Sequence, residues 1–383
     1  MNITNLRPPL WVDHATSLLA MIDVLQQSPI IAVDTESNSL FAYQEQVCLI
    51  QFSTVDADYL VDPLVIQDMS PLGAVFANPD IEKVFHAAEY DVICLKRDFQ
   101  YEFNNLFDTM VASRILGREN QGLGDVIKDL YGITLEKKYQ RANWGMRPLK
   151  PDMLEYARLD TYFLIDVRNQ FRADLQEMNR WQLAQEDFAR LCRIAVPENN
   201  NEEEKCWKVL GSEKLKTEQL AVLQALCAYR EKRAKATNLP VFKVLNNKTL
   251  MAIAKAMPQD LVDLENIPGL SSKLVHRIGE KLVKIVENNR RQKPYKRSFN
   301  HTRPDPILAA KVEALRIWRK NTALEIGVPS DVILPREMLY EIVTADPHNP
   351  DALQPVLADY PWRFEQYGDQ ILETLQEAVF TNK

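Results

Sequence analysis

Two carboxylates follow directly on a predicted buried strand. The run at 29–33 is apolar, and Asp34-Thr35-Glu36 comes next. Side chains alternate along a strand, so Asp34 and Glu36 project to the same face of the sheet. Two neighbouring carboxylates repel each other and are costly to desolvate, and a divalent cation is the usual explanation for such a pair. Acids solvated at a strand end are the simpler alternative, since D-x-E alone is a weak signal.

Two further elements carry acids of the same kind. A helix is predicted over 151–178, and on it Tyr156 and Asp160 lie one turn apart on one face. Met153 and Leu164 extend that stripe, so the face points inward, where an unpartnered Asp is rare. Asp91 lies near the start of a helix predicted over 89–98, where stabilisation of the helix N-terminus is the alternative.

Together, Asp34, Glu36, Asp91 and Asp160 with the facing Tyr156 form a constellation from three elements. Hard cations such as Mg²⁺ and Mn²⁺ take oxygen ligands, and two of them need an acid cluster of this kind. Such a pair activates a water molecule for in-line attack on a phosphodiester.

The chain around these residues is typical of mixed α/β structure. Further strands are predicted at 46–52, 58–62 and 83–86, and further helices near 108–116 and 123–130. Residues 205–383 are helical by their apolar spacing and contain two copies of one module, related by an offset of 89 residues. We therefore expect a domain over 1–196, a first repeat over 212–292 and a second repeat over 305–380. Polar linkers are predicted at 197–211 and 293–304.

Charge divides the chain in the same places. Residues 1–204 carry a net charge of −14, residues 205–303 carry +13 from 21 basic and 8 acidic residues, and residues 304–383 carry −6. A compact module at +13 attracts polyanions, of which nucleic acid is the commonest; a solvated basic surface is the alternative. The candidate nucleic-acid contacts of the first repeat are Arg230, Lys232, Arg233 and Lys235. Tyr229 and Trp318 hold matched positions in the two repeats, which favours core packing over base stacking.

Several classes of protein are excluded. No apolar run approaches the ~18 residues of a membrane span, and no G-x-x-x-x-G-K-[ST] loop indicates a nucleotide cofactor. The cysteines contain no C-x-x-C pair and the histidines no H-x-x-x-H pair, which argues against a zinc site. The first residues lack the pattern of a signal peptide, so we expect a cytoplasmic protein.

The sequence resembles the ribonuclease D family, in the branch of the DEDD 3′→5′ exonucleases with a Tyr in its third motif. The resemblance rests on three motifs in the family's order: Val33-Asp34-Thr35-Glu36, Phe85-His86-Ala87-Ala88-Glu89-Tyr90-Asp91 and Tyr156-Ala157-Arg158-Leu159-Asp160. Phe107-Asp108-Thr109-Met110 and the segment from Trp144 to Leu149 also match. The two repeats resemble tandem HRDC (helicase-and-ribonuclease-D C-terminal) domains.

The resemblance implies a ribonuclease-H-like fold, with a five-stranded mixed sheet between helices, followed by two all-α domains. It implies that the four carboxylates hold two Mg²⁺ or Mn²⁺ ions and that Tyr156 orients the attacking water. The implied substrate is the 3′ end of a structured RNA, such as a tRNA precursor, cut to nucleoside 5′-monophosphates. A non-catalytic RNA-binding scaffold and a DNA 3′→5′ exonuclease remain as alternatives.

One position departs from the family pattern. Ser37 stands where several members have an aromatic residue, and Leu40 or Tyr43 is the substitute we predict for packing on the terminal base. Lys137 and Arg147 are predicted to contact phosphates at the scissile end, with simple solvation as the alternative.

Overall fold

The computed structural model describes residues 7–197, 212–294 and 305–380. It divides into two compact units, one formed by residues 1–37, 47–196 and 301–383 and the other by residues 38–46 and 197–300. The linkers predicted at 197–211 and 293–304 lie almost wholly outside the described residues. Within the described ranges, no helix is long and apolar enough to cross a membrane.

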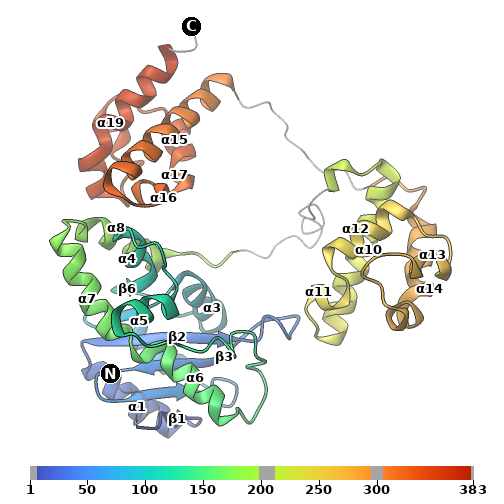
Figure 1. The fold of residues 1–383 in the computed structure, drawn as a ribbon, viewed down its shortest axis with the longest axis horizontal. Coiled ribbons are helices and arrows are strands. Elements are labelled where there is room, and N and C mark those ends of the chain that lie inside the picture. Colours follow the sequence, from blue (N-terminus) through green and yellow to red (C-terminus); the bar gives the residue numbers. More distant parts are fainter. Residues whose placement is uncertain (1–6, 198–211, 295–304, 381–383) are drawn as a thin grey trace. The chain divides into compact units, whose positions relative to one another are not determined.

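A mixed six-stranded sheet forms the centre of the N-terminal domain (Figure 1). Its order is β1-β4-β3-β2-β5-β6, with β2 antiparallel to β3 and parallel to β5. The strands are β1 (Leu10–Val12), β2 (Ile30–Ser37), β3 (Val47–Ser53), β4 (Asp58–Val61), β5 (Glu82–Phe85) and β6 (Leu106–Asp108). The predicted mixed α/β fold is confirmed, but the predicted number of five strands was wrong, because the sheet has six. The two edge strands, β1 and β6, have three residues each, too few to show a periodic pattern.

Helices cover both faces of this sheet. They are α1 (Ala15–Gln27), α2 (Gly73–Ala77), α3 (Glu89–Phe99), α4 (Thr109–Ile115), α5 (Leu123–Tyr131), α6 (Pro151–Tyr162), α7 (Leu164–Glu177) and α8 (Trp181–Arg193), with a short 3₁₀ turn at Ser70–Leu72. The helix predicted over 151–178 is interrupted at Phe163, whose buried ring stacks on Tyr131. The apolar stripe continues through this break, so periodicity does not reveal it.

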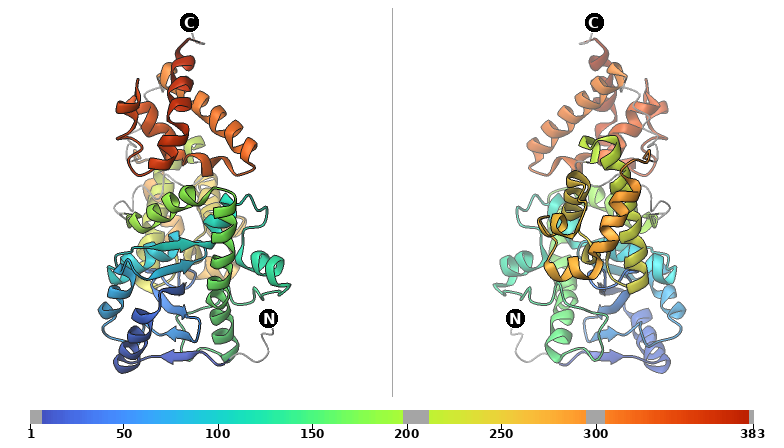
Figure 2. Two further views of the ribbon diagram at one scale, coloured as in Figure 1. Left: turned by 90° about the vertical axis from the view of Figure 1, so that its left-hand side faces the viewer. Right: turned by 90° about the vertical axis from the view of Figure 1, so that its right-hand side faces the viewer.

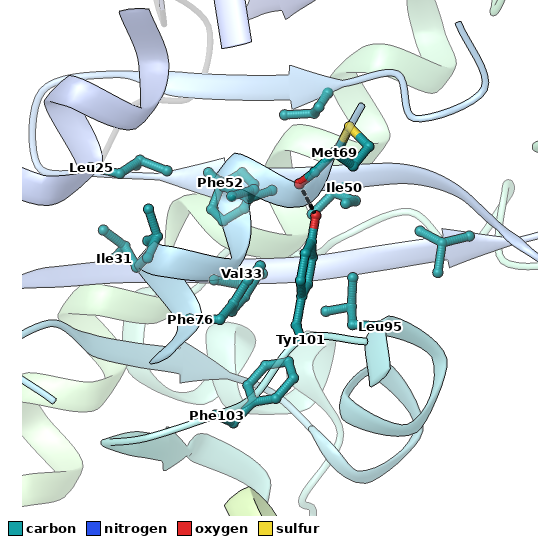
Figure 3. Close-up of a cluster of buried hydrophobic side chains, with 14 of the residues drawn as sticks. Leu25, Ile31, Val33, Ile50, Phe52, Met69, Phe76, Leu95, Tyr101 and Phe103 are labelled. Carbon is teal, nitrogen blue, oxygen red and sulfur yellow. Dashed lines mark hydrogen bonds between the residues drawn. The ribbon is translucent and has the colours of Figure 1, made fainter. Parts of the chain in front are cut away.

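The alternation of β2 assigns its residues to two separate cores. Val33 belongs to the cluster under α1 and α2, where Tyr101 stacks on Phe76 and donates to the carbonyl oxygen of Met69 at 2.6 Å (Figure 3). Ala32 faces the other cluster, formed with α4, α5, α7 and α8. Asp34 and Glu36 continue on the face of Ala32, which is the face that α6 crosses over β2 and β3.

The helical region confirms the offset of 89 residues in its element bounds. In the first repeat, the helices are α10 (Thr217–Thr237), α11 (Val241–Val244), α12 (Asn247–Ala256), α13 (Leu261–Glu265) and α14 (Ser272–Asn289), after a 3₁₀ turn at Ser212–Lys214. In the second repeat, they are α15 (Pro306–Ile326), α16 (Ser330–Ile333), α17 (Arg336–Ala345), α18 (Pro350–Leu353) and α19 (Pro361–Phe380). Each helix of the second repeat begins 89 residues after its counterpart. The long helices α15 and α19 pack side by side (Figure 2).

A buried arginine recurs in the two repeats. Arg230 donates to the carbonyl oxygen of Leu245 at 3.2 Å, and Arg319 donates to that of Leu334 at 2.9 Å. Tyr229 and Trp318 pack against the cores of their repeats, so the packing interpretation of both is confirmed.

The second repeat docks on helix α8 of the N-terminal domain through a buried ion pair. Arg363 is fully buried and donates to Glu186 at 2.8 Å and to Asp187 at 2.9 Å. Two carbonyl oxygens, of Val332 and Ile333, accept its remaining bonds. Burial raises the pKa of both acids, and the Arg363 guanidinium opposes this rise.

We expect Arg363→Ala to lower the stability of the unit by about 3–5 kcal/mol, because it leaves two buried carboxyl groups without their partner. Thermal and denaturant unfolding of the full chain measures the loss. The control is Arg316→Ala, whose guanidinium pairs with Glu313 at the surface, where an ion pair contributes little to stability. Equal midpoints for the two variants would contradict this account of the docking contact.

Candidate active site

Strand β2 brings the first two acids into the site. Asp34 lies opposite Gln51 of β3 and Glu36 lies opposite Leu49. A register shift between Glu36 and Ser37 ends the regular ladder directly after the second acid. The strand is therefore held by both neighbours up to the point where its carboxylates begin, and it presents them on one face.

The turn before α3 places the third acid. Asp91 lies in the first turn of α3, is 6% exposed and accepts a hydrogen bond from the Thr35 hydroxyl of β2. Ala87 in that turn has φ +66°, a conformation that costs a residue other than glycine of the order of 1 kcal/mol.

Asp108 holds this turn in place. It is 1% exposed and accepts from the backbone N–H groups of Ala87 at 3.0 Å and Ala88 at 2.7 Å. The same carboxylate caps α4 by accepting from Met110 and Val111. Four N–H donors on one buried carboxylate fix the strained turn, and with it the direction in which Asp91 enters the site.

Helix α6 supplies Tyr156 and Asp160 as predicted. The Tyr156 ring packs between Tyr139, with ring centroids 5.8 Å apart, and Trp144, at 6.1 Å. Arg147 fastens the segment that carries these two aromatic residues: all five of its N–H donors are used, on both carboxylate oxygens of Asp62 and on the carbonyl oxygens of Trp144, Met146 and Cys48.

The four carboxylates and the tyrosine act on one another electrostatically. Burial is the main cause that raises the pKa of Asp34 well above its usual value, and the charges of Asp91, Asp160 and Glu36 raise it further. For Glu36, burial is also the main cause that raises the pKa well above its usual value, and the charges of Asp160 and Asp91 raise it further. Burial raises the pKa of Asp91 to about 7 and that of Asp160 to about 7.

The same acids act electrostatically on Tyr156. Burial raises the pKa of its hydroxyl far above the usual range, and Asp160, Glu36 and Asp34 raise it further. The side chains from β2 and α6 are therefore near enough to act on one another, and Asp91 acts on Asp34 and Glu36; their joint role as one site stays a prediction.

The donor set fits hard divalent cations in its chemistry. All four groups are carboxylates, they are desolvated, and their mutual repulsion is what a bound cation relieves. In the described part of the chain, no three His, Cys, Asp or Glu side chains stand in a group that would by itself enclose an ion. The chain thus supplies the ligand types, and the carboxylates must turn toward a common point to use them.

The predicted nucleic-acid contacts divide into exposed and occupied side chains. Lys137, Lys232, Arg233, Lys235 and Leu40 are exposed, and their contacts stay predictions. Arg230 is 6% exposed and bonded inside its repeat, and Arg147 has no free donor, so the predicted RNA contacts of both are wrong. Tyr43 donates to Glu231 at 2.7 Å and packs on the core of the first repeat, which does not support a stacking role.

Sequence reasoning missed two residues of this site. Asp108 and Thr35 act through others, Asp108 through the α3 turn and Thr35 through its bond to Asp91. An Asp before a predicted helix is a capping signal, but nothing in the sequence shows that the same carboxylate also reaches the turn of another helix.

We expect the stability of the protein in EDTA to fall as the pH rises from about 5 to about 8, relative to an Asp160→Asn variant. A carboxyl group whose pKa is raised by folding stabilises the folded state below its ordinary pKa, and this contribution is lost as the pH passes through the folded pKa. Thermal midpoints across this range measure the difference. Asp152→Asn, an exposed acid of the same helix, should follow the wild-type curve; parallel curves for all three proteins would contradict the prediction.

Comparison with known families agrees with the motifs. A 3′–5′ exonuclease family model matches residues 9–176, and an HRDC domain model matches residues 219–286 and 309–375. Among solved structures, the ribonuclease D of Escherichia coli aligns over 97% of this chain and 99% of its own with a TM-score of 0.68 at 24% identity, which shows the fold. The catalytic core of RRP6 from Trypanosoma brucei aligns with a TM-score of 0.63 at 28% identity, over 76% of this chain and 81% of its own.

Sequence relatives extend along most of the chain. Ribonuclease D of Pseudomonas paraeruginosa is 29% identical over 96% of this chain and 98% of its own length. Ribonuclease D of Escherichia coli K12 is 30% identical over 71% of this chain and 72% of its own length. The exosome complex exonuclease RRP6 of Saccharomyces cerevisiae is 31% identical over 80% of this chain, which spans 44% of that protein. The chain therefore belongs to the ribonuclease D family and is a 3′→5′ exoribonuclease of the DEDD type.

Proposed function

We propose that this enzyme trims the 3′ ends of structured RNAs, tRNA precursors among them, and releases nucleoside 5′-monophosphates by a two-metal-ion mechanism. The observation that carries the proposal is the convergence of four desolvated carboxylates and one tyrosine hydroxyl from three elements. The relatives named ribonuclease D and exosome exonuclease support an RNA substrate. A cytoplasmic location stays a prediction of the sequence.

Asp34, Glu36, Asp91 and Asp160 are the residues that would hold the two ions, Mg²⁺ or Mn²⁺. When bound, the ions supply charge neutralisation at the phosphate and a nucleophilic water at neutral pH. The chain itself positions these ligands. Strand β2 and helix α6 carry three of the carboxylates, and the bonds from the turn before α3 to Asp108 fix the position of Asp91. Ionising all four groups costs free energy in this buried setting, and bound cations would offset that cost.

Tyr156 contributes as a neutral phenol. Because the raised pKa keeps its hydroxyl protonated throughout the physiological range, Tyr156 is no general base. It is a hydrogen-bonding group whose ring is wedged between Tyr139 and Trp144. Such a fixed hydroxyl would orient the attacking water by a hydrogen bond.

The first test is a time course on a 3′-extended tRNA that carries a label at its 5′ end. With Mg²⁺, we expect a ladder of products shortened one nucleotide at a time, and none with EDTA. Asp91→Asn should lower the rate by at least about a thousandfold, because it removes a ligand of ions that supply several kcal/mol of transition-state stabilisation. Binding of the RNA, measured by filter retention, should persist.

The same experiment separates the alternatives. Intact binding without degradation by the wild-type protein would favour the non-catalytic scaffold. A ladder on a matched DNA strand alone would favour a DNA exonuclease. Full turnover by Asp91→Asn would contradict the assignment of the carboxylates.

We also propose that the basic first repeat binds the body of the RNA. Lys232, Arg233 and Lys235 are exposed near the end of α10, whereas the second repeat is acidic. Deleting the whole helical region is a poor test, because the second repeat covers α8 through Arg363. Charge reversal at the surface leaves that contact in place.

We expect the triple change Lys232→Glu, Arg233→Glu and Lys235→Glu to weaken RNA binding. The slope of the logarithm of affinity against that of salt concentration should flatten by about 2, since each lost phosphate contact on a single strand removes roughly 0.7. Lys320→Glu, an exposed lysine of the second repeat, is the control and should leave the slope unchanged. An unchanged slope in the triple variant would contradict RNA binding by this surface.

A further inference from the structure

Gln51 of β3 is buried without a hydrogen-bond partner. Its side chain is 0% exposed, and neither the Nε2 nor the Oε1 atom has a partner. Within the described residues, no other side chain leaves two buried polar atoms unpaired. An unsatisfied buried polar group destabilises the folded state, so a leucine or methionine at this place would make a more stable protein.

The strand register places this carboxamide beside the first catalytic acid. Gln51 is the cross-strand partner of Asp34, and residues opposite each other on antiparallel strands project to the same face with Cβ atoms roughly 4.5–5.5 Å apart. A glutamine side chain therefore reaches the Asp34 carboxylate without any movement of the backbone.

Helix α6 closes this space from above. Ser53, two residues along the strand on the same face, is 2.7 Å from the Thr161 hydroxyl of α6. Leu49, two residues in the other direction, packs with Ala157 and Tyr156 of the same helix. Gln51 thus lies between the sheet and the helix that carries Tyr156 and Asp160.

The unmet needs of Gln51 and Asp34 are complementary. The carboxamide has two N–H donors without acceptors, and the Asp34 carboxylate on the neighbouring strand offers acceptor oxygens directly opposite. The four acids do not yet stand in a group that encloses an ion. A bond from Gln51 to one oxygen of ionised Asp34 would satisfy the donor, stabilise the charge and direct the other oxygen toward the remaining acids.

We propose that Gln51 is a positioning residue of the active site, whose buried carboxamide donates to the Asp34 carboxylate and orients it for divalent ions. The inference rests on the proposed two-metal function. It assigns a role to a buried polar group that destabilises the ion-free protein. A hydrogen bond to Asp34 in the ion-bound protein would offset this destabilisation.

The test compares the full-length wild-type protein with Gln51→Met and Gln51→Leu. Mn²⁺ is titrated calorimetrically without RNA, and thermal midpoints are recorded in EDTA. Because both changes remove an unsatisfied buried amide, the midpoint in EDTA should stay the same or rise. The dissociation constant for Mn²⁺ should increase about tenfold, the loss expected for one hydrogen bond to a charged group. With RNA and Mg²⁺, kcat should fall while KM for RNA is unchanged.

Ser53→Ala is the matched control on the same strand. It removes the bonds of Ser53 to Thr161 and Asp58, so we expect a lower midpoint in EDTA with Mn²⁺ affinity within about twofold of the wild type. A merely structural Gln51 would give the same result as Ser53→Ala.

The outcomes distinguish this inference from the proposed function. If the wild-type protein binds Mn²⁺ and both Gln51 variants bind it equally well, the inference is overturned and the two-metal function stands. If both variants lose stability in EDTA without losing Mn²⁺ affinity, Gln51 is structural and the inference is again overturned. If the wild-type protein neither binds Mn²⁺ nor degrades RNA, both proposals fail.

Discussion

The mutual repulsion of four desolvated carboxylates is the constraint on which the rest of this structure depends. Burial raises the pKa of Asp34, Glu36, Asp91 and Asp160, and the charges of neighbouring acids raise the pKa of Asp34 and Glu36 further. A surface loop would let such groups separate into water. Here three of them are attached to elements that are packed into the fold: β2 is bonded on both sides, and α6 packs against β2 and β3. The fold keeps the charges together and leaves their compensation to ligands.

Supporting contacts of the site share one feature, which is that each buried polar group serves two elements at once. Asp108 caps α4 and holds the left-handed Ala87 before α3. Arg147 ties the aromatic segment around Tyr156 to Asp62 and to a carbonyl oxygen of β3. Such bridging groups hold the turn before α3 and the aromatic segment around Tyr156 against the sheet, although neither belongs to a strand.

The long elements and the placement of the candidate-site acids on them were predictable because their signals are local. The run before Asp34, the i, i+4 spacing of Tyr156 and Asp160, and the offset of 89 residues each follow from neighbours in sequence. The features that the sequence did not reveal depend on contacts between residues far apart in the chain. Arg230 and Arg147 look like solvated cations, yet each is occupied by acceptors that only the fold brings near. Strands β1 and β6 form by pairing with β4 and β5, because three residues are too few to carry a periodic apolar pattern.

The divergence of the two repeats follows from what each one touches. Both keep the same helices and the same buried arginine, Arg230 or Arg319, because these belong to the module's own packing. The second repeat has in addition Arg363, which is committed to Glu186 and Asp187 of the N-terminal domain. The matching position in the first repeat is Leu274, so this repeat lacks the ion pair that joins the second repeat to α8. The shared module packing thus leaves the surface of each repeat free to differ, and the first repeat carries the positive charge.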